Sequence, residues 1–370
     1  MIFKSQLLRQ NVETRGGTPT PPFSSTTPVS QVVAMCQKCK YSLEKPMLVA
    51  YGADSNTIYN QINATGLQYT TQDPVVKNLI GGDAPVMTFA EDATFSNHRK
   101  LPEGYFDPTD IGRNIGEIFS LDMSRSARIL RLREWLSEAL AGARLDTTGF
   151  AERYFNHMFG PVSAPRPLSK VEYHEDADLN RLAVNHIDVG VYCDRVLNAP
   201  GPKQTSNHRL HQALQIANWD INQIDVIDDL GVPAFKNYGF ADKINLTNDM
   251  GNGLTLTVHG LQHVSAIVKK YCYNEDAKTY SLTLTCFLYD AFGIDSDDLV
   301  EFGAPKHAFI DLQDNDSFKE SVLNDLSEFY RVHSSLAHAM NAWWLLQHSY
   351  GFAPLITRIV MEKDYEIYVG

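Results

Sequence analysis

The chain has 370 residues, of which 44% are hydrophobic and 11% aromatic, a composition that fits a globular protein of two ordinary domains. Its formal net charge of −12 argues against non-specific binding to nucleic acid or anionic lipid, because both need a basic surface. No apolar run approaches the roughly 20 residues that cross a bilayer, and the N-terminus lacks the features of a secretory signal. We therefore expect no nucleic-acid partner, no transmembrane segment, and synthesis in the cytoplasm without a signal peptide.

The first 31 residues are predicted to be a flexible leader, because residues 10–30 are rich in Gly, Ser, Thr and Pro. Residues 32–205 are predicted to form a mixed, largely helical N-terminal domain. Turn-forming residues at 160–167 and 200–202 are the candidate boundaries.

The clearest helix of that domain begins after Asp122 and runs to about Gly142, with apolar residues at helical spacing. Its arginines are interpreted as a solvated face paired with local carboxylates, and the alternative is contact with a membrane surface or an acidic partner. The histidines and acids between 170 and 204 match no metal-ligand spacing, so they are interpreted as a polar connector.

Five cysteines are too few and too scattered for a disulfide framework. Cys36 and Cys39 form a single Cys-x-x-Cys without further ligands, so they are interpreted as incidental cysteines, with a metal or redox site as the alternative. Cys272 and Cys286 fall on two arms of a predicted hairpin but not opposite each other. We therefore predict that both are free thiols.

Residues 206–370 are predicted to form an α+β C-terminal domain. A helix is expected from about Asn207 to Ile227. Alternating residues then predict three strands in an antiparallel meander, at 254–259, 264–273 and 280–289.

A capping box at Ser317–Glu320 opens the longest predicted helix, which runs from Phe318 to Ser349. Residues 354–360 and 365–369 are expected to finish the chain as strands. The predicted fold class is thus α+β, with a mostly helical N-terminal region and a small C-terminal antiparallel sheet or partial barrel packed on one long helix.

An acidic loop follows the predicted strand 280–289. It runs from Tyr289 to Leu299 and holds four carboxylates within nine residues: Asp290, Asp295, Asp297 and Asp298. A strand that ends in an acidic, glycine-containing loop is a common place for chemistry. The alternative is a solvated turn in which Asp297 or Asp298 caps backbone amides.

Three segments in order carry a resemblance to a known family: Leu256–His259, Asp290–Leu299, and Trp343 through Pro354. They resemble a proteobacterial family known as domain of unknown function family 3289. The resemblance covers about residues 207–370, and it departs where family members often carry an arginine before the tryptophan pair, since Asn341 and Ala342 stand there. Members of that family occur among proteins that bacteria use against each other, often near contractile secretion systems.

A second similarity is to the colicin M type bacteriocins, which hydrolyse lipid II, the lipid-linked peptidoglycan precursor. It rests on the order of strands, the Tyr289-Asp290 loop and a downstream histidine, His307, although His307 is followed by Ala308 rather than arginine.

Hydrolysis of a phosphoester or pyrophosphate would need carboxylates that hold Mg²⁺ and a base that activates water. The predicted metal ligands are Asp295, Asp297 and Asp298. The predicted catalytic residues are Asp290, Asp295, His259, Tyr289 and His307, with His259 as the base because histidine titrates near neutrality.

Together these features predict an antibacterial effector or toxin of interbacterial competition that acts on the cell envelope, delivered to the periplasm of a target bacterium. The expected partners are an immunity protein and a secretion-system component. The alternative is a non-catalytic binding or structural module of a secretion system.

Overall fold

The computed structural model describes residues 39–54, 67–91, 124–143, 149–159, 171–198, 209–228, 230–233, 253–258, 260–295 and 340–370. The described residues from Lys40 to Gly370 belong to one compact unit, whose fold is given below.

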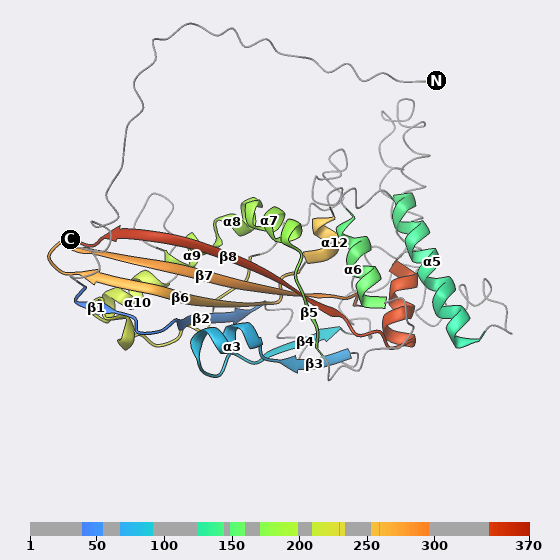
Figure 1. The fold of residues 1–370 in the computed structure, drawn as a ribbon, viewed down its shortest axis with the longest axis horizontal. Coiled ribbons are helices and arrows are strands. Elements are labelled where there is room, and N and C mark those ends of the chain that lie inside the picture. Colours follow the sequence, from blue (N-terminus) through green and yellow to red (C-terminus); the bar gives the residue numbers. More distant parts are fainter. Residues whose placement is uncertain are drawn as a thin grey trace, which may run out of the picture. The chain divides into compact units, whose positions relative to one another are not determined.

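A six-stranded sheet is the centre of this unit, and its strands follow the order β1-β6-β7-β8-β5, with β2 also paired to β6. β6, β7 and β8 form an antiparallel meander, and Figure 1 shows them side by side as three long strands. The short β5 is parallel to β8. The strands are β1 (Tyr41–Ser42), β2 (Met47–Ala53), β5 (Tyr173–His174), β6 (His263–Asn274), β7 (Thr279–Phe292) and β8 (Leu355–Tyr368).

A second, two-stranded antiparallel sheet is made by β3 (Leu67–Thr71) and β4 (Met87–Glu91), with the helix α3 (Pro74–Ile80) between them in sequence. α3 begins where the Asp73 carboxylate accepts a 2.8 Å hydrogen bond from the Val75 amide. It ends at Gly81, whose φ of 61° is the left-handed conformation that glycine adopts readily.

Helices cover the other side of the large sheet, where α7 packs against β8, α12 against β7 and α9 against both strands. α5 is capped by the Ser124 hydroxyl, which accepts from the Ala127 amide at 3.2 Å, and the apolar residues of α6 recur at helical spacing. The described helices here are α5 (Arg125–Ala143), α6 (Phe150–Phe159), α7 (Ala177–Asn185), α8 (Ile187–Gly190), α9 (Tyr192–Leu197), α10 (Leu210–Ile216) and α12 (Leu254–Val258).

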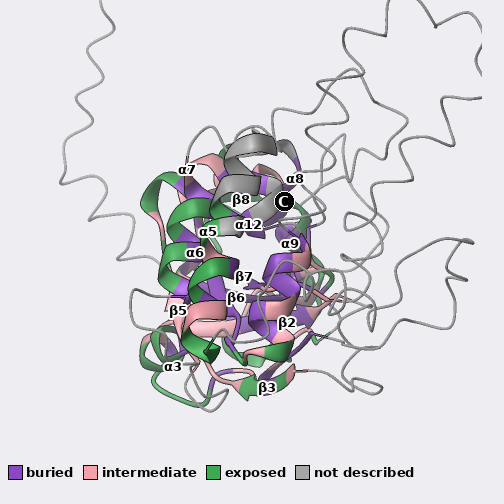
Figure 2. Cartoon of the chain, turned by 90° about the vertical axis from the view of Figure 1, so that its right-hand side faces the viewer, coloured by how far each residue is buried: buried purple, intermediate pink, exposed green. Residues whose placement is uncertain are grey.

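Alternate residues of β7 supply two hydrophobic cores, one on each face of the sheet. Leu284, Cys286 and Leu288 join the larger core under the helices. Phe287 and Tyr289 join the smaller core with β3, α3 and β4. Figure 2 shows the buried residues, in purple, concentrated on the sheet between these two layers. Both faces of the central strand are therefore covered, as its nearly unbroken apolar sequence requires.

The structure confirms the mixed helix and strand composition and the predicted hairpin, which β6 and β7 form around residues 275–278. The sheet formed by the described residues is open, with β5 at one end of the strand order and β1 at the other, so it does not close into a barrel. Strands from before residue 206 (β1, β2 and β5) belong to the same sheet as β6–β8. The predicted boundary between 205 and 206 thus falls between segments that share one sheet.

Two of the predicted elements are wrong. Residues 254–258 are the helix α12 rather than a strand, because Leu254 and Val258, four residues apart, both face the core. The helix expected over 207–227 stops at Ile216, because Asn218 and Trp219 take positive φ values of 51° and 68°.

One further prediction is corrected in part, and another is tested only at its end. The closing strands expected at 354–360 and 365–369 are one continuous strand, β8. Of the long helix expected at 318–349, only residues 340–349 are described, and they are helical to Ser349 as predicted, with a π-helical turn at Leu345–Ser349. The stretch 318–339 lies outside the described residues, as does the leader 1–31.

Of the cysteine predictions, one is confirmed and two are wrong. Cys286 is a free thiol, as predicted. Cys272 is disulfide-bonded, as is Cys39, so the prediction of a free thiol at 272 and the interpretation of Cys39 as incidental are both wrong. The free thiol at Cys272 was predicted from the β6–β7 hairpin alone, in which Cys272 pairs with Ser281. That reasoning left out the other neighbour of β6, the strand β1.

Candidate functional site

The predicted site lies at the end of β7, and the structure separates its two first residues. Tyr289 and Asp290 are neighbours in the strand, paired with Arg358 and Thr357 of β8. Because successive strand residues point to opposite faces, the two side chains enter different layers of the molecule. Both are buried.

Tyr289 belongs to a buried, charged cluster on the α3 face. Its hydroxyl donates to Asp73 at 2.8 Å, and Arg358 donates to the other oxygen of the same carboxylate at 2.6 Å. Arg358 also donates to Glu175 and lies over the ring of Tyr173 at 5.2 Å. Burial raises the pKa of Tyr289 well above its ordinary value, and the nearby Asp73 charge adds to this. In this setting Tyr289 joins α3 to the large sheet.

Asp290 faces the helices on the opposite side, beneath Tyr154 of α6. Burial raises the pKa of Tyr154, the side chain of Thr357 lowers it, and the charges of Asp176 and Asp290 raise it. Thr357, beside Asp290 in register, donates to the backbone oxygen of Thr257 at 3.2 Å. Asp290 thus lies on the floor of a polar cluster that α6, α7 and α12 build over β7 and β8.

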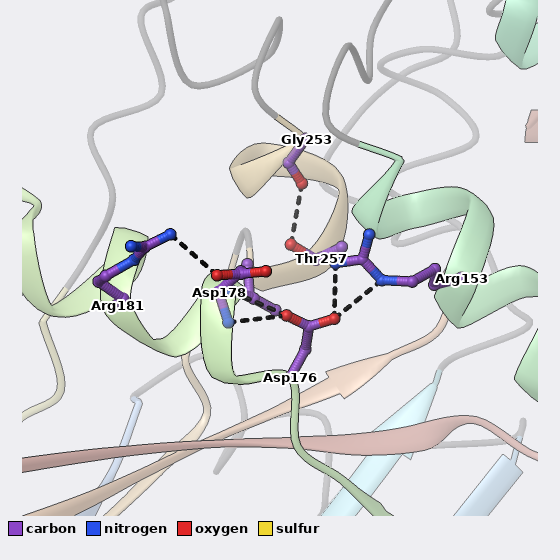
Figure 3. A network of polar contacts seen from close by, with 7 residues as sticks. Arg153, Asp176, Asp178, Arg181, Gly253 and Thr257 are labelled. Atoms are coloured by element: carbon purple, nitrogen blue, oxygen red, sulfur yellow. Dashed lines mark hydrogen bonds and ion pairs between the residues drawn. The ribbon is translucent and has the colours of Figure 1, made fainter.

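Arg153 and Asp176 form the upper part of this cluster (Figure 3). Arg153 donates two hydrogen bonds to one oxygen of Asp176, at 2.9 and 2.6 Å. The other oxygen accepts from the backbone amides of residues 178 and 179 at the start of α7. Burial alone would raise the pKa of Asp176, but these hydrogen bonds outweigh it and hold the pKa below its usual value.

Two histidines lie beside this cluster. His157 is hydrogen-bonded through its Nε2 to Glu172, and the side chains of this pair are 41% and 38% exposed. The ring of His174 lies 4.7 Å from that of His157 and packs edge-on against Tyr154 at 4.4 Å. Burial lowers the pKa of His174, and the proximity of His157 lowers it further. This His157–Glu172 pair is the arrangement in the described residues best suited to proton transfer at the surface.

Asp295 lies beyond the strand, next to a tightly held turn. Both backbone groups of Ile294 are bonded to the buried side-chain amide of Gln347, at 3.0 and 2.9 Å. A Cβ atom at Gly293 would lie 3.0 Å from side-chain atoms of Glu91 and Pro354, so a larger residue there would require these side chains to shift.

The remaining predicted residues, His259, His307, Asp297 and Asp298, lie outside the described residues. Of the three predicted metal ligands, only Asp295 is described, and the described ranges contain no group of three or more His, Cys, Asp or Glu side chains that could hold a metal ion. Magnesium at this loop stays a prediction. No described helix has the length and apolar character needed to span a membrane.

Comparison of the chain with protein-family models, with curated proteins and with solved structures finds no match in any of the three. The resemblance of residues 207–370 to a known family accordingly stays a prediction.

The His157–Glu172 pair was missed at the level of sequence. A signal for α6 does exist, because Tyr154, Phe155, Met158 and Phe159 recur at helical spacing after Gly149 and leave His157 on the polar side. No spacing rule points to its partner Glu172, which lies fifteen residues further along the chain. Only the fold, which brings β5 against β8, places the two together.

Proposed function

We propose that the chain is an antibacterial effector that acts on the cell envelope of a target bacterium and hydrolyses a phosphate-linked precursor such as lipid II. The observation that carries the chemistry is the hydrogen bond between Glu172 and a half-exposed His157. The resemblance of the C-terminal segments to interbacterial proteins supports the substrate class. The candidate centre thereby moves from the acidic loop to α6.

His157 is the proposed acid–base residue. A carboxylate bonded to one ring nitrogen fixes the tautomer and leaves the second nitrogen to take a proton from water. Attack of that water on phosphorus forms the new P–O bond as the bond to the leaving oxygen breaks, and the proton can return to that oxygen. Glu172 acts as the positioning residue.

Arg153 supplies positive charge on the same side of α6. It precedes His157 by four residues, one helical turn, so the two side chains are neighbours on the helix surface. Its guanidinium is held by Asp176, and its side chain is 46% exposed. A guanidinium presented in this way suits a phosphate oxygen, which accepts charge-assisted hydrogen bonds.

The disulfide-bonded cysteines support action in the periplasm, the compartment in this proposal. Cys39 and Cys272 are both disulfide-bonded, and such bonds form and persist in oxidising environments such as the bacterial periplasm. A chain made in the cytoplasm and delivered to the periplasm of a target cell would acquire them there. An immunity protein and a secretion-system component are the partners that this function requires.

A non-catalytic module of a secretion system is the second candidate. The observation that favours it is the burial of Tyr289 and Asp290, since two of the five residues first assigned to catalysis are covered by packed helices and by α3. In that case the acidic loop is a connector, and the His157–Glu172 pair is a surface ion pair of small energetic weight.

Expression in a target bacterium, with and without an added secretion signal, tests the proposal. We expect the periplasmic form to arrest growth and deplete lipid-linked precursors, and the cytoplasmic form to be harmless. Growth unaffected in both compartments would contradict the effector function.

Matched variants then separate the two candidate centres. His157→Gln is expected to abolish the growth arrest, whereas Glu275→Gln, which alters another exposed acid paired with a cation, should leave it intact. Asp295→Ala tests the acidic loop: a loss of toxicity with Asp295→Ala but not with His157→Gln would return the site to the loop.

A further inference from the structure

A pair of buried cysteines lies in the larger core, apart from the disulfide-bonded Cys39 and Cys272. The sulfur atoms of Cys193 and Cys286 are 3.4 Å apart, although 93 positions separate them in sequence, and both residues are fully buried. They are the free cysteines among the residues that the structure describes. Neither takes part in the polar cluster around His157.

The fold holds the two sulfurs together through α9 and the central strand. Cys193 is the second residue of α9, and Cys286 lies in β7 between Ala266 of β6 and Met361 of β8. α9 is tied to β8 because Asp194 accepts hydrogen bonds from Lys363 at 2.6 Å and Tyr365 at 2.7 Å. The residue next to Cys193 is thus anchored to the strand next to Cys286.

We propose that Cys193 and Cys286 form a further disulfide when the chain folds in an oxidising compartment. A disulfide bond is about 2.05 Å long, so the sulfurs must approach by about 1.4 Å, a movement within reach of side-chain rotation and a small shift of a six-residue helix. The oxidation state of Cys272 supplies the second observation, because an environment that oxidises it can also oxidise a thiol pair already in contact.

The reaction is a thiol–disulfide exchange with a small-molecule or protein disulfide as the oxidant. One cysteine thiolate attacks the donor disulfide, forms a mixed disulfide and releases one donor thiol. The second cysteine thiolate attacks the mixed disulfide, closes the Cys193–Cys286 bond and releases the second donor thiol. The two cysteines lose two electrons and two protons, and the donor disulfide is reduced to two thiols.

Burial decides when this exchange occurs. Since both sulfurs are inaccessible in the folded chain, oxidation takes place during folding or on local opening of α9. The bond would then fix α9 to the centre of the sheet. A reducing cytoplasm leaves this cross-link open, and an oxidising compartment closes it.

Peptide mapping of the full chain tests the proposal without any variant. The chain is unfolded and reduced, refolded in a buffer of reduced and oxidised glutathione, denatured, alkylated and digested under non-reducing conditions. We expect a cross-linked peptide that joins Cys193 to Cys286 under conditions in which Cys272 is fully oxidised. Complete alkylation of both residues under those conditions, or a link from either to another cysteine, would overturn the proposal.

The pair of variants Cys193→Ser and Cys286→Ser provides the functional readout. In oxidising buffer each is expected to melt roughly 5 °C below the wild type, the shift that one disulfide gives in a chain of this size. In buffer reducing enough to open the cross-link the gap should narrow. A gap that is the same in both buffers would show that only packing was lost and would contradict the cross-link.

Discussion

The two faces of β7 at its C-terminal end carry polar clusters of different kinds. On the α3 face, Asp73 and Tyr289 are buried, and Asp73 accepts hydrogen bonds from Tyr289 and from the largely covered side chain of Arg358. On the helical face, Asp290 is buried as well, but the polar groups above it reach the surface at His157 and Glu172. Adjacent residues of one strand thus serve two clusters, one centred on the buried carboxylate of Asp73 and one that ends in the half-exposed ring of His157.

The difference shows which of these clusters suits chemistry. A buried ion pair whose hydrogen bonds are satisfied contributes to the unique arrangement of the core, and breaking it leaves an uncompensated charge. A half-exposed histidine with a carboxylate partner can exchange protons with a substrate. We therefore assign structure to the Tyr289 face and propose function for the face above Asp290.

The largest effect on stability is expected from Asp73→Ala. It removes a partner from both Arg358 and Tyr289 and the cap from α3, so the free energy of unfolding should fall by about 3–5 kcal/mol. Urea denaturation measures this change directly.

Asp83→Ala is the matched control, because Asp83 is an exposed carboxylate paired with Lys77 of α3. Its effect should stay within about 0.5 kcal/mol. Equal losses in Asp73→Ala and Asp83→Ala would contradict the structural role of the α3 face.

A smaller, pH-dependent effect is expected from Asp176→Asn on the helical face. The pKa of Asp176 is lower in the folded chain than its usual value of 3.8, so its charge stabilises the fold above the unfolded pKa, and this contribution is lost as the pH falls through the folded pKa. The variant should be less stable than the wild type by about 1 kcal/mol at pH 7.

The same comparison at low pH provides the check. Near pH 3 the difference in unfolding free energy between Asp176→Asn and the wild type should shrink. A difference that stays constant between pH 7 and pH 3 would mean that the Arg153–Asp176 pair does not depend on charge.

An effect no larger than that of Asp176→Asn is expected from Thr357→Val, which keeps the shape of the side chain and removes its hydrogen bond to Thr257. We expect a loss of about 1 kcal/mol, the ordinary contribution of one hydrogen bond. Thermal unfolding measures this loss. If Thr357→Val lowered the free energy of unfolding as much as Asp73→Ala, both faces of β7 would carry structural clusters, and the proposed difference between them would be contradicted.

The β6–β7 hairpin and the mixture of helices and strands could be predicted from the sequence. The shared face of Tyr280, Leu282, Leu284, Cys286 and Leu288 was predicted from alternation alone and lies in the larger core. The capped helix after Asp122 is α5, with Ser124 as its cap.

Other features depended on contacts between distant segments. The alternation in residues 254–258 also satisfies a helix, and packing of Leu254 and Val258 decided between the two. The acidic residues in 175–178 were interpreted from the sequence as part of a polar connector. In the structure Asp176 caps α7 and Glu175 binds Arg358, roles that no local pattern specifies.

Hydrolysis of purified lipid II by matched variants tests the proposed role of His157 most directly. Release of the phosphate-bearing head group from its lipid is measured for the wild type, His157→Gln and Glu275→Gln, with unfolding midpoints recorded for each. We predict that His157→Gln lowers the rate at least about 100-fold with an unchanged midpoint, and that Glu275→Gln matches the wild type. A His157→Gln variant that hydrolyses lipid II as fast as the wild type would contradict the proposed centre.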